Sequence, residues 1–417
     1  MMARPRPEGV LRAVGRFLTD PRTVGVAQAA PRTVAFMARN WSAGRAEPAD
    51  SEEEGARFGS SVGLAAQVLL DEVLISAMRN PRLFPHGDDY RRAGDDVRAA
   101  LAIWRREGWL DDPESFHAEP TAPADWAVTH HRSFDQFYEH LTFPSAYRPR
   151  PGEPGGTRWT SHEPNRTAHA YVVRHRRPGR PWLVCIHGFG MGRAAMDLRA
   201  FRASALHRMG INLLLPVLPM HGPRQDPGAQ VGEGFMSIDL IDAVHGMAQA
   251  ALDIRTAVQW IRATEGDVPV GVYGISLGGC VTALVASLER ELACAIAGIP
   301  ATDLPGLYRR HAPPGVRRRA LQAGALGPEA DAVYSVVSPL ALTPKPPRDR
   351  RYVFAGVGDR MSTSGQARRL WEHWERPKMA WYPGGHLGFF WQGAVTSFVT
   401  DALVESGLAT GSLSPAQ

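Results

Sequence analysis

Residues 268–279 read VPVGVYGISLGG, and this stretch decides the fold class. Apolar residues alternate at its start as in a short strand, and apolar residues at helical spacing follow it over residues 280–288. Between them, the pentapeptide 274–278 (GISLG) forces Ser276 into a sharp strand-to-helix turn. Glycines two residues to either side remove Cβ atoms that would collide in such a turn. The stretch therefore predicts a candidate nucleophile, Ser276, at the carboxyl end of a strand.

A chain with 42 glycines contains short glycine patterns by chance, so the segments around this pentapeptide decide whether it marks a nucleophile. Short apolar strands alternate there with helices. The expected strands are 168–174, 182–186, 211–218, 268–273, 292–299, 352–357 and 379–382. The expected helices are 194–209, 238–263, 366–374 and 394–403, with a further helix directly after Ser276. Repeated strand-helix units predict an α/β fold, a doubly wound and mostly parallel sheet with helices on both faces.

Two residues downstream of the serine are candidates for the other catalytic roles. A serine hydroxyl is a weak nucleophile near neutral pH, so an imidazole must accept its proton and a carboxylate must orient that imidazole. His386 lies in a glycine-rich loop after the last expected strand, and Asp359 follows Gly358 at the end of the strand before it. Asp303 also follows a strand end, so it is an alternative candidate for the acid.

The stretch 185–190 (CIHGFG) is a candidate oxyanion-binding loop, because it ends an apolar strand and leads into a helix. Attack on an acyl carbon develops a negative oxygen that backbone N–H groups must stabilise. The N–H of Leu277, directly after the serine, would supply one donor, and that of Phe189 the other. The donor in this loop could lie one residue to either side, and His187-Gly188 could also form an ordinary turn.

Four short motifs occur in one order: HGFG (187–190), GISLGG (274–279), GVGDR (356–360) and GGH (384–386). In that order and spacing, residues of about 165–405 resemble the α/β-hydrolase superfamily. The resemblance implies a triad of Ser276, Asp359 and His386, an acyl-enzyme intermediate, and no metal or organic cofactor.

A serine nucleophile distinguishes the chain from haloalkane dehalogenase and epoxide hydrolase relatives, which attack with aspartate. We therefore expect a serine hydrolase that cleaves a carboxylic ester or thioester. An acyltransferase or a peptidase would use the same triad, and a hydrolase-fold binding protein without turnover is the alternative from another class.

The region before this pattern is expected to be a mainly helical accessory or cap region, residues 1–150. Helices are expected over 64–77 and 95–107, and the Pro/Gly-rich stretch 149–156 predicts the boundary to a catalytic domain at 151–410. An irregular, Arg-rich stretch at 300–350 is expected to form a lid. Its arginines could bind an anionic group of the substrate or simply form a solvated face.

Composition excludes several classes of function. The net charge of +5 arises from basic residues scattered among acids, so no nucleic-acid partner is expected. The cysteines are odd in number and unclustered, which indicates neither a disulfide framework nor a zinc site and favours a cytoplasmic protein: Cys185, Cys280 and Cys294. The longest apolar segment, 62–78, carries Asp71 and Glu72 in its middle, which argues against a membrane span.

The expected partner is a small-molecule or lipid-like acyl substrate. A weak peripheral membrane contact is a further hypothesis for residues 1–45, where apolar residues are interleaved with several arginines: Val10, Leu11, Val14, Phe17 and Leu18. The sequence leaves the oligomeric state open.

Overall fold

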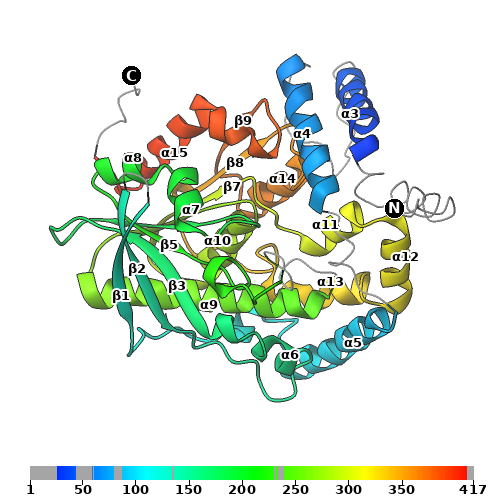
Figure 1. Ribbon diagram of the computed structural model, residues 1–417, viewed down its shortest axis with the longest axis horizontal. Coiled ribbons are helices and arrows are strands. Elements are labelled where there is room, and N and C mark those ends of the chain that lie inside the picture. Colours follow the sequence, from blue (N-terminus) through cyan, green and yellow to red (C-terminus); the bar gives the residue numbers. More distant parts are fainter. Residues whose placement is uncertain are drawn as a thin grey trace, which may run out of the picture.

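The structure, a computed structural model, describes residues 26–43, 59, 61–78, 87–133, 136–229, 232 and 239–410. Among these residues a single sheet has the strand order β1-β2-β3-β5-β4-β6-β7-β8-β9 (Figure 1). The strands are β1 (Ala127–Ser133), β2 (Gln136–Pro144), β3 (Thr167–Val173), β4 (Trp182–Ile186), β5 (Asn212–Pro216), β6 (Val270–Ile275), β7 (Leu292–Gly298), β8 (Arg351–Gly356) and β9 (Lys378–Tyr382).

The strands from β5 through β4 to β9 are parallel, whereas β1, β2 and β3 extend the sheet in antiparallel fashion. Every residue of β4, β5, β6 and β8 is buried. Strands buried on both faces consist of nearly continuous apolar residues, which explains why the sequence pattern located them.

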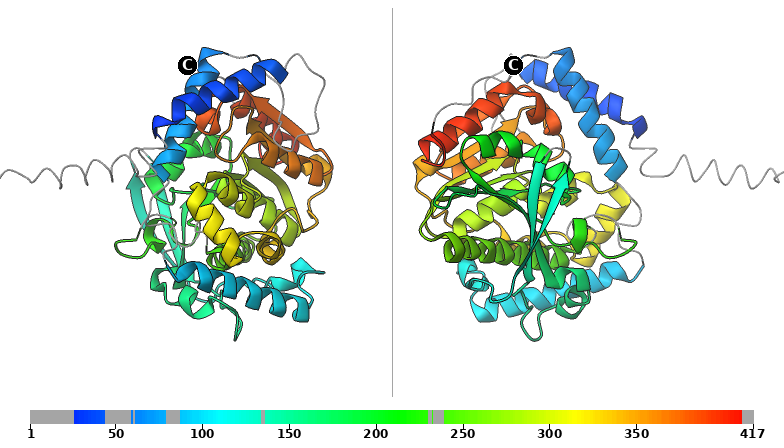
Figure 2. Two further views of the ribbon diagram at one scale, coloured as in Figure 1. Left: turned by 90° about the vertical axis from the view of Figure 1, so that its right-hand side faces the viewer. Right: turned by 60° about the vertical axis from the view of Figure 1, so that its left-hand side comes forward.

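Helices cover both faces of the sheet (Figures 1 and 2). One face is covered by α9 (Leu240–Glu265) and α10 (Leu277–Leu288), and the other by α7 (Ala194–Ala200), α8 (Ala203–Arg208) and α15 (Gly393–Glu405). The doubly wound, mostly parallel α/β fold expected from the sequence is thereby confirmed. The helix expected over 194–209 is divided in two, because Arg202 has a positive φ of 51° between α7 and α8.

The remaining helices connect or flank these layers. They are α3 (Ala29–Ala43), α4 (Val62–Met78), α5 (Asp89–Glu107), α6 (Gly156–Thr160), α11 (Leu304–His311), α12 (Pro314–Ala323), α13 (Pro328–Tyr334) and α14 (Ser364–His373). Short 3-10 turns are η2 (Pro113–Phe116), η3 (Glu163–Arg166), η4 (Gly222–Arg224), η5 (Ser335–Val337), η6 (Arg348–Arg350) and η7 (His386–Trp391).

The region before residue 150 contains both expected helices, as α4 and α5, but it also contains two strands that the sequence did not predict. Strand β1 (AVTHHRS) is exposed or half-buried along its whole length, so its residues show no apolar alternation. It is held by antiparallel pairing with β2, which pairs in turn with β3. The expectation of a mainly helical region therefore missed an extension of the main sheet. The division into two domains at residue 150 stays a prediction.

The stretch 300–350 is not irregular, since it forms α11, α12 and α13. Helices α12 and α13 pack against α5, α13 also packs against α9, and α11 packs against α13. The junction is close: a Cβ added at Gly94 of α5 would lie 1.8 Å from the carbonyl oxygen of Ala323. Arg309 of the arginine-rich part pairs with Asp331 at 2.6 Å.

The N-terminal helices lie at two ends of the molecule (Figure 2). Helices α3 and α4 contact each other at the end that carries β8 and β9, and α5 lies at the opposite end beneath α9 (Figure 2). None of the described helices has the length and apolarity needed to cross a bilayer. The apolar residues between Val10 and Leu18, to which we ascribed a membrane contact, lie outside the described residues.

Candidate active site

Ser276 lies at the turn between β6 and α10, with φ 57° and ψ −119°. A non-glycine residue adopts this conformation only where the surrounding structure enforces it. The flanking glycines show how tight the turn is. A Cβ at Gly274 would lie 2.1 Å from the carbonyl oxygen of Gly278, and one at Gly278 would lie 2.0 Å from that of Ile186. The sequence pattern and the observed geometry agree on a strained turn that presents the serine hydroxyl.

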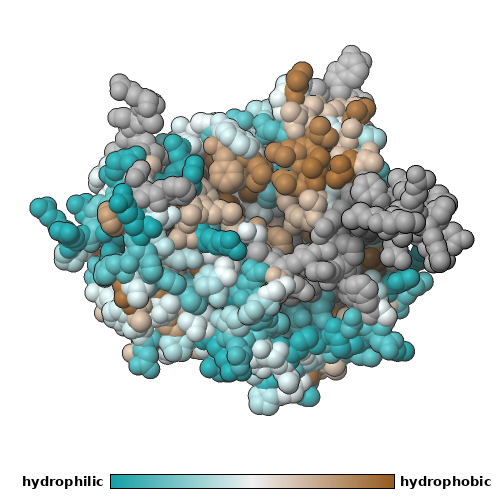
Figure 3. Space-filling model, viewed as in Figure 1, coloured by the Kyte–Doolittle hydropathy of each residue, from teal (hydrophilic) through white to brown (hydrophobic). Residues whose placement is uncertain are grey.

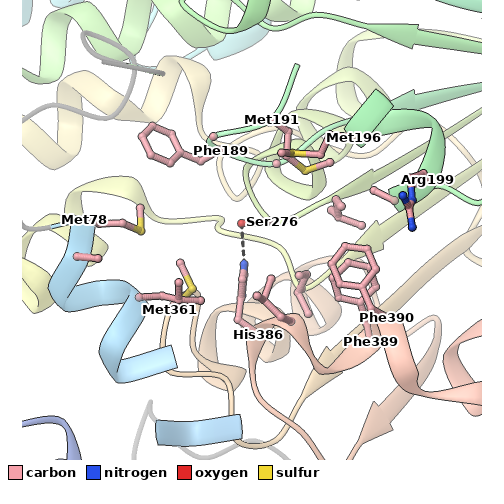
Figure 4. A pocket seen from close by; sticks show the side chains of 18 residues that line it. Met78, Phe189, Met191, Met196, Arg199, Ser276, Met361, His386, Phe389 and Phe390 are labelled. Carbon is pink, nitrogen blue, oxygen red and sulfur yellow. Dashed lines mark hydrogen bonds between the residues drawn. The ribbon is translucent and has the colours of Figure 1, made fainter. Parts of the chain in front are cut away.

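Ser276, His386 and Asp359 form one chain of hydrogen bonds. The Oγ of Ser276 lies 3.0 Å from Nε2 of His386 (Figure 4). Nδ1 of His386 lies 2.7 Å from Oδ2 of Asp359. The other carboxylate oxygen of Asp359 accepts the backbone N–H groups of Met361 and Ser362 at 2.8 and 2.9 Å. His386 and Asp359 are buried, and Ser276 is half-buried. The structure thus brings together the three residues that the sequence singled out.

Asp303, the alternative acid, has other partners. Its Oδ1 accepts the N–H of Gly306 at 2.8 Å and so caps α11, and its Oδ2 lies 3.1 Å from Arg369. The carboxylate that faces the imidazole is that of Asp359.

The charges around His386 favour its protonated form. Burial by itself would lower the pKa of His386, but the charge of Asp359, its hydrogen bond and the charge of Asp71 outweigh burial and raise this pKa above its usual value. An imidazole with a raised pKa is a stronger base toward a serine proton and a more stable cation after accepting it.

The loop after β4 lies against the nucleophile. A Cβ at Gly188 would lie 3.3 Å from Cβ of Ser276. His187 orders this loop, because its Nδ1–H donates to the carbonyl of Gly188 at 2.8 Å and its Nε2 accepts the N–H of Leu218 at 3.0 Å. Burial lowers the pKa of His187 to about 4, so the ring is neutral near pH 7.

The two expected oxyanion donors are near the serine but their role stays a prediction. Leu277 is the first residue of α10, so its N–H has no acceptor one turn earlier in the helix. Phe189 follows the close-packed Gly188 and lines the same pocket as Ser276.

A cavity of about 870 Å³ opens over Ser276 and His386. Figure 4 shows its labelled side chains on both sides of the serine, with Met78 and Met361 at one end and Phe389, Phe390 and Arg199 at the other. Most of its lining is apolar: Leu74, Ala77, Met78, Phe189, Met191, Met196, Ala200, Ile275, Ile299, Met361, Leu387, Phe389 and Phe390. The site is therefore suited to an apolar ligand.

Helix α4 forms one wall of this cavity through Leu74, Ala77 and Met78. In contrast, none of residues 300–350, all of which the structure describes, lines it. Within this stretch α12 and α13 pack against α5, and the expected lid stays a prediction. The arginines of that stretch therefore do not line the pocket.

Sequence reasoning missed the contribution of α4 to the site. A signal was present, since Asp71 and Glu72 interrupt an otherwise apolar helix, but this signal served only as an argument against a membrane span. Both side chains are buried against the loop that follows β8, where Asp71 accepts the N–H of Arg360 and Glu72 pairs with its guanidinium. The contact spans almost 290 residues of sequence, so no local pattern reveals it.

Among the residues that the structure describes, no cluster of three or more His, Cys, Asp or Glu side chains is placed to hold a metal ion. The three cysteines are unpaired and buried in the core.

Comparison with known proteins identifies the class. The family model described as "Alpha/beta hydrolase domain containing 18" matches residues 157–304, which include Ser276 and the loop 185–190. The chain belongs to the α/β-hydrolase superfamily.

Among individual proteins, the chain is 42% identical over 350 residues to the uncharacterized protein MT2702 of Mycobacterium tuberculosis strain CDC 1551 / Oshkosh. It has the same identity to the uncharacterized protein Rv2627c of Mycobacterium tuberculosis strain H37Rv. Each match covers 84% of this chain and 84% of the relative.

The chain is also similar to two solved acetyl xylan esterases. For the enzyme from Paenibacillus sp. R4 the identity is 17%, the TM-score is 0.46, and the match covers 67% of this chain and 94% of that one. For acetyl xylan esterase 1 from Thermoanaerobacterium sp. JW/SL YS485 the identity is 14%, the TM-score is 0.48, and the coverages are 72% and 93%.

Proposed function

We propose that this protein is a serine hydrolase that cleaves a carboxylic ester, or a thioester, with an apolar acyl group. The observation that carries the proposal is the continuous chain from Ser276 Oγ through His386 to Asp359 at the floor of an apolar cavity. Such an alignment serves nucleophilic attack on an acyl carbon.

In the first half of the proposed reaction, Ser276 Oγ attacks the carbonyl carbon and its proton passes to Nε2 of His386. Asp359 holds the imidazole by its Nδ1–H and stabilises the cation that forms. The N–H groups of Leu277 and Phe189 bind the oxygen that becomes negative. Collapse of this intermediate breaks the bond to the leaving alcohol or thiol, which takes the proton from His386, and an acyl-enzyme remains.

In the second half, a water molecule gives its proton to His386 Nε2 and attacks the acyl carbon. The bond to Ser276 Oγ then breaks, Oγ regains the proton from His386, and the carboxylic acid leaves. No step requires an oxidant, a reductant or a cofactor, because the protons that leave one group are taken up by another.

The cavity supports an apolar acyl group. Its volume of about 870 Å³ lies in the range of pockets for drug-sized ligands, which is roughly 300–1,000 Å³. Burial of each methylene in such a pocket contributes about 0.8 kcal/mol. Large apolar side chains of α4, α7 and η7 are also exposed, among them Leu69, Leu70, Met196 and Trp391. Figure 3 shows apolar surface gathered over α4 on the same face.

Covalent labelling with a fluorophosphonate tests the proposal without knowledge of the natural substrate. We expect the parent protein to be labelled at one site and Ser276→Ala, equally folded by circular dichroism, to remain unlabelled. A folded parent that does not react would falsify the mechanism. The alternative, a binding protein of the same fold without turnover, would then be favoured. Labelling without hydrolysis across a panel of ester and thioester substrates would contradict the ester assignment and favour acyl transfer or peptide hydrolysis.

A further inference from the structure

Helix α4 packs directly on the two loops that carry the acid and the base of the triad. A Cβ at Gly358, which precedes Asp359, would lie 2.6 Å from Cδ1 of Leu64. Cβ atoms at Gly384 and Gly388, on either side of His386, would lie 2.5 and 2.3 Å from Oε1 of Gln67. The loops that carry Asp359 and His386 therefore approach side chains of α4 most closely at their glycines.

Asp71 joins the two loops through one atom. Its Oδ2 accepts the backbone N–H of His386 at 2.8 Å and that of Arg360, the residue after Asp359, at 3.0 Å. A Cβ at Gly385 would lie 2.9 Å from the same oxygen. One carboxylate of α4 thus contacts the backbone next to both the base and the acid.

The burial of Asp71 indicates a specific role. The residue is 1% exposed, and its second oxygen has no hydrogen-bond partner within the part of the chain that the structure describes. A buried carboxylate with an unsatisfied oxygen is costly. A neutral side chain at position 71 of α4 would avoid that cost. Packing of α4 against the two loops therefore does not by itself explain why this residue is a carboxylate.

We propose that Asp71 is a positioning residue of the active site, which fixes the Asp359 and His386 loops relative to each other and adds a second negative charge beside the imidazole. This inference rests on the proposed hydrolase function and extends it, because it gives Asp71 of α4 a role in positioning the proposed base and acid.

The electrostatics agree with this geometry. Burial, with the charge of Asp359 adding to it, raises the pKa of Asp71 to about 7. The charge of Asp71 in turn helps to raise the pKa of His386. The other charged or titratable groups around this pair, from α3, α4, β9 and the loop after β8, are Arg32, Glu72, Tyr382, Asp359 and Arg360.

The rate of fluorophosphonate labelling, measured from about pH 5 to about pH 9, tests the role of Asp71. Asp71→Ala removes both the charge and the acceptor, and we expect its labelling rate to fall about 10- to 100-fold, as for a catalytic group displaced by ~1 Å. Asp71→Asn keeps an oxygen acceptor, so its rate should fall less. Asp71→Asn lacks the negative charge that raises the pKa of His386. The pH at which its labelling rate reaches half of the maximum should therefore be lower than in the parent.

Glu72→Gln is the matched control. Glu72 is the next residue of the same helix and is also buried, but its carboxylate faces the side chains of Arg360 and Arg32 at 3.0 and 3.6 Å. We expect this variant to lose stability while its rate rises with pH over the same range as the parent.

If the parent is labelled normally, either of two results would overturn this inference but not the hydrolase function. One is an Asp71→Ala labelling rate within about twofold of the parent, and the other is an unshifted pH profile of Asp71→Asn. If Asp71→Ala does not fold, as judged by circular dichroism, the pH profile of Asp71→Asn decides. A parent that is not labelled at all would overturn the hydrolase function and this inference with it.

Discussion

His386 Nδ1 and Asp359 Oδ2 lie 2.7 Å apart, and the two side chains are only 5% and 2% exposed. The acid is held in turn by the N–H groups of Met361 and Ser362, so its carboxylate has a single free direction, which is toward the imidazole. The orientation of the base therefore depends on one buried contact between two loops at the carboxyl ends of β8 and β9.

Asp359→Asn should abolish most of the activity. The amide cannot stabilise the imidazolium and favours the wrong tautomer of His386, and the corresponding change in a serine triad lowers kcat by about 10⁴-fold. Asp303→Asn is the control, since it removes the ion pair with Arg369, keeps an oxygen that can cap α11, and removes no contact to the imidazole. Its activity should stay within about twofold of the parent, at a cost of less than about 1 kcal/mol in stability. Loss of activity in Asp303→Asn with retention in Asp359→Asn would reverse the assignment of the acid.

The pH dependence of kcat/KM follows from the state of His386. The imidazole must be neutral to accept the serine proton, so activity is absent below its pKa and appears as the pH rises through it. Because Asp359 and Asp71 outweigh burial and raise this pKa, half of the maximal activity should be reached above pH 6.5, the ordinary value for histidine. A steady-state profile with a water-soluble ester measures this midpoint, and a midpoint below 6.5 would contradict the predicted direction.

Gly278→Ala should destabilise the fold severely. The added methyl group would lie 2.0 Å from the carbonyl oxygen of Ile186 and 2.5 Å from that of His187, both of which are backbone atoms that cannot move aside cheaply. We expect a loss of about 3 kcal/mol or more in urea unfolding. Gly315→Ala in α12 is the control, because a Cβ there meets nothing within 4 Å. Replacement of a helical glycine should be neutral or stabilise by up to about 1 kcal/mol.

The length of the acyl chain should determine the rate of hydrolysis. Each methylene buried in the cavity contributes about 0.8 kcal/mol, so kcat/KM for a series of p-nitrophenyl esters should rise up to about fourfold per methylene until the cavity is filled. Ala77→Phe, on the α4 wall, should shorten the preferred chain. Ala66→Phe places the same bulk on an exposed part of α4 and should leave the preference unchanged. A series without dependence on chain length would argue against the cavity as the acyl site.

Acid should destabilise the protein through His187. The pKa of His187 is lowered by burial from 6.5 to about 4 in the folded state, so the unfolded chain binds the proton first as the pH falls. The stabilisation is complete above pH 6.5 and is lost as the pH falls toward 4, by about 3 kcal/mol in total. His187→Gln should be less stable at pH 7 but should lose less stability on acidification, as measured by urea unfolding at several pH values. His130→Gln, an exposed position in β1, should keep the parent slope.

The sequence by itself determined the parallel part of the sheet and pointed to Ser276, His386 and two candidate acids, Asp359 and Asp303. The strands β4, β6 and β8 are almost continuously apolar because both of their faces are buried, and such a run can be seen in the local sequence alone. The glycines around Ser276 are equally local, since a turn of this tightness excludes a Cβ whatever surrounds it. His386 and Asp359 could be chosen because parallel strands end at the same edge of a sheet.

Only the tertiary structure decided which acid faces the imidazole and what lies over the site. Asp303 and Asp359 both follow strand ends, and the difference between them is a direction in space. Strand β1 is too exposed for an apolar pattern to reveal it, and it exists through pairing with β2. Asp71 is one acid in an apolar helix, and its contact with His386 joins residues 315 positions apart. Contacts of this kind depend on how the elements are packed together, which no local pattern encodes.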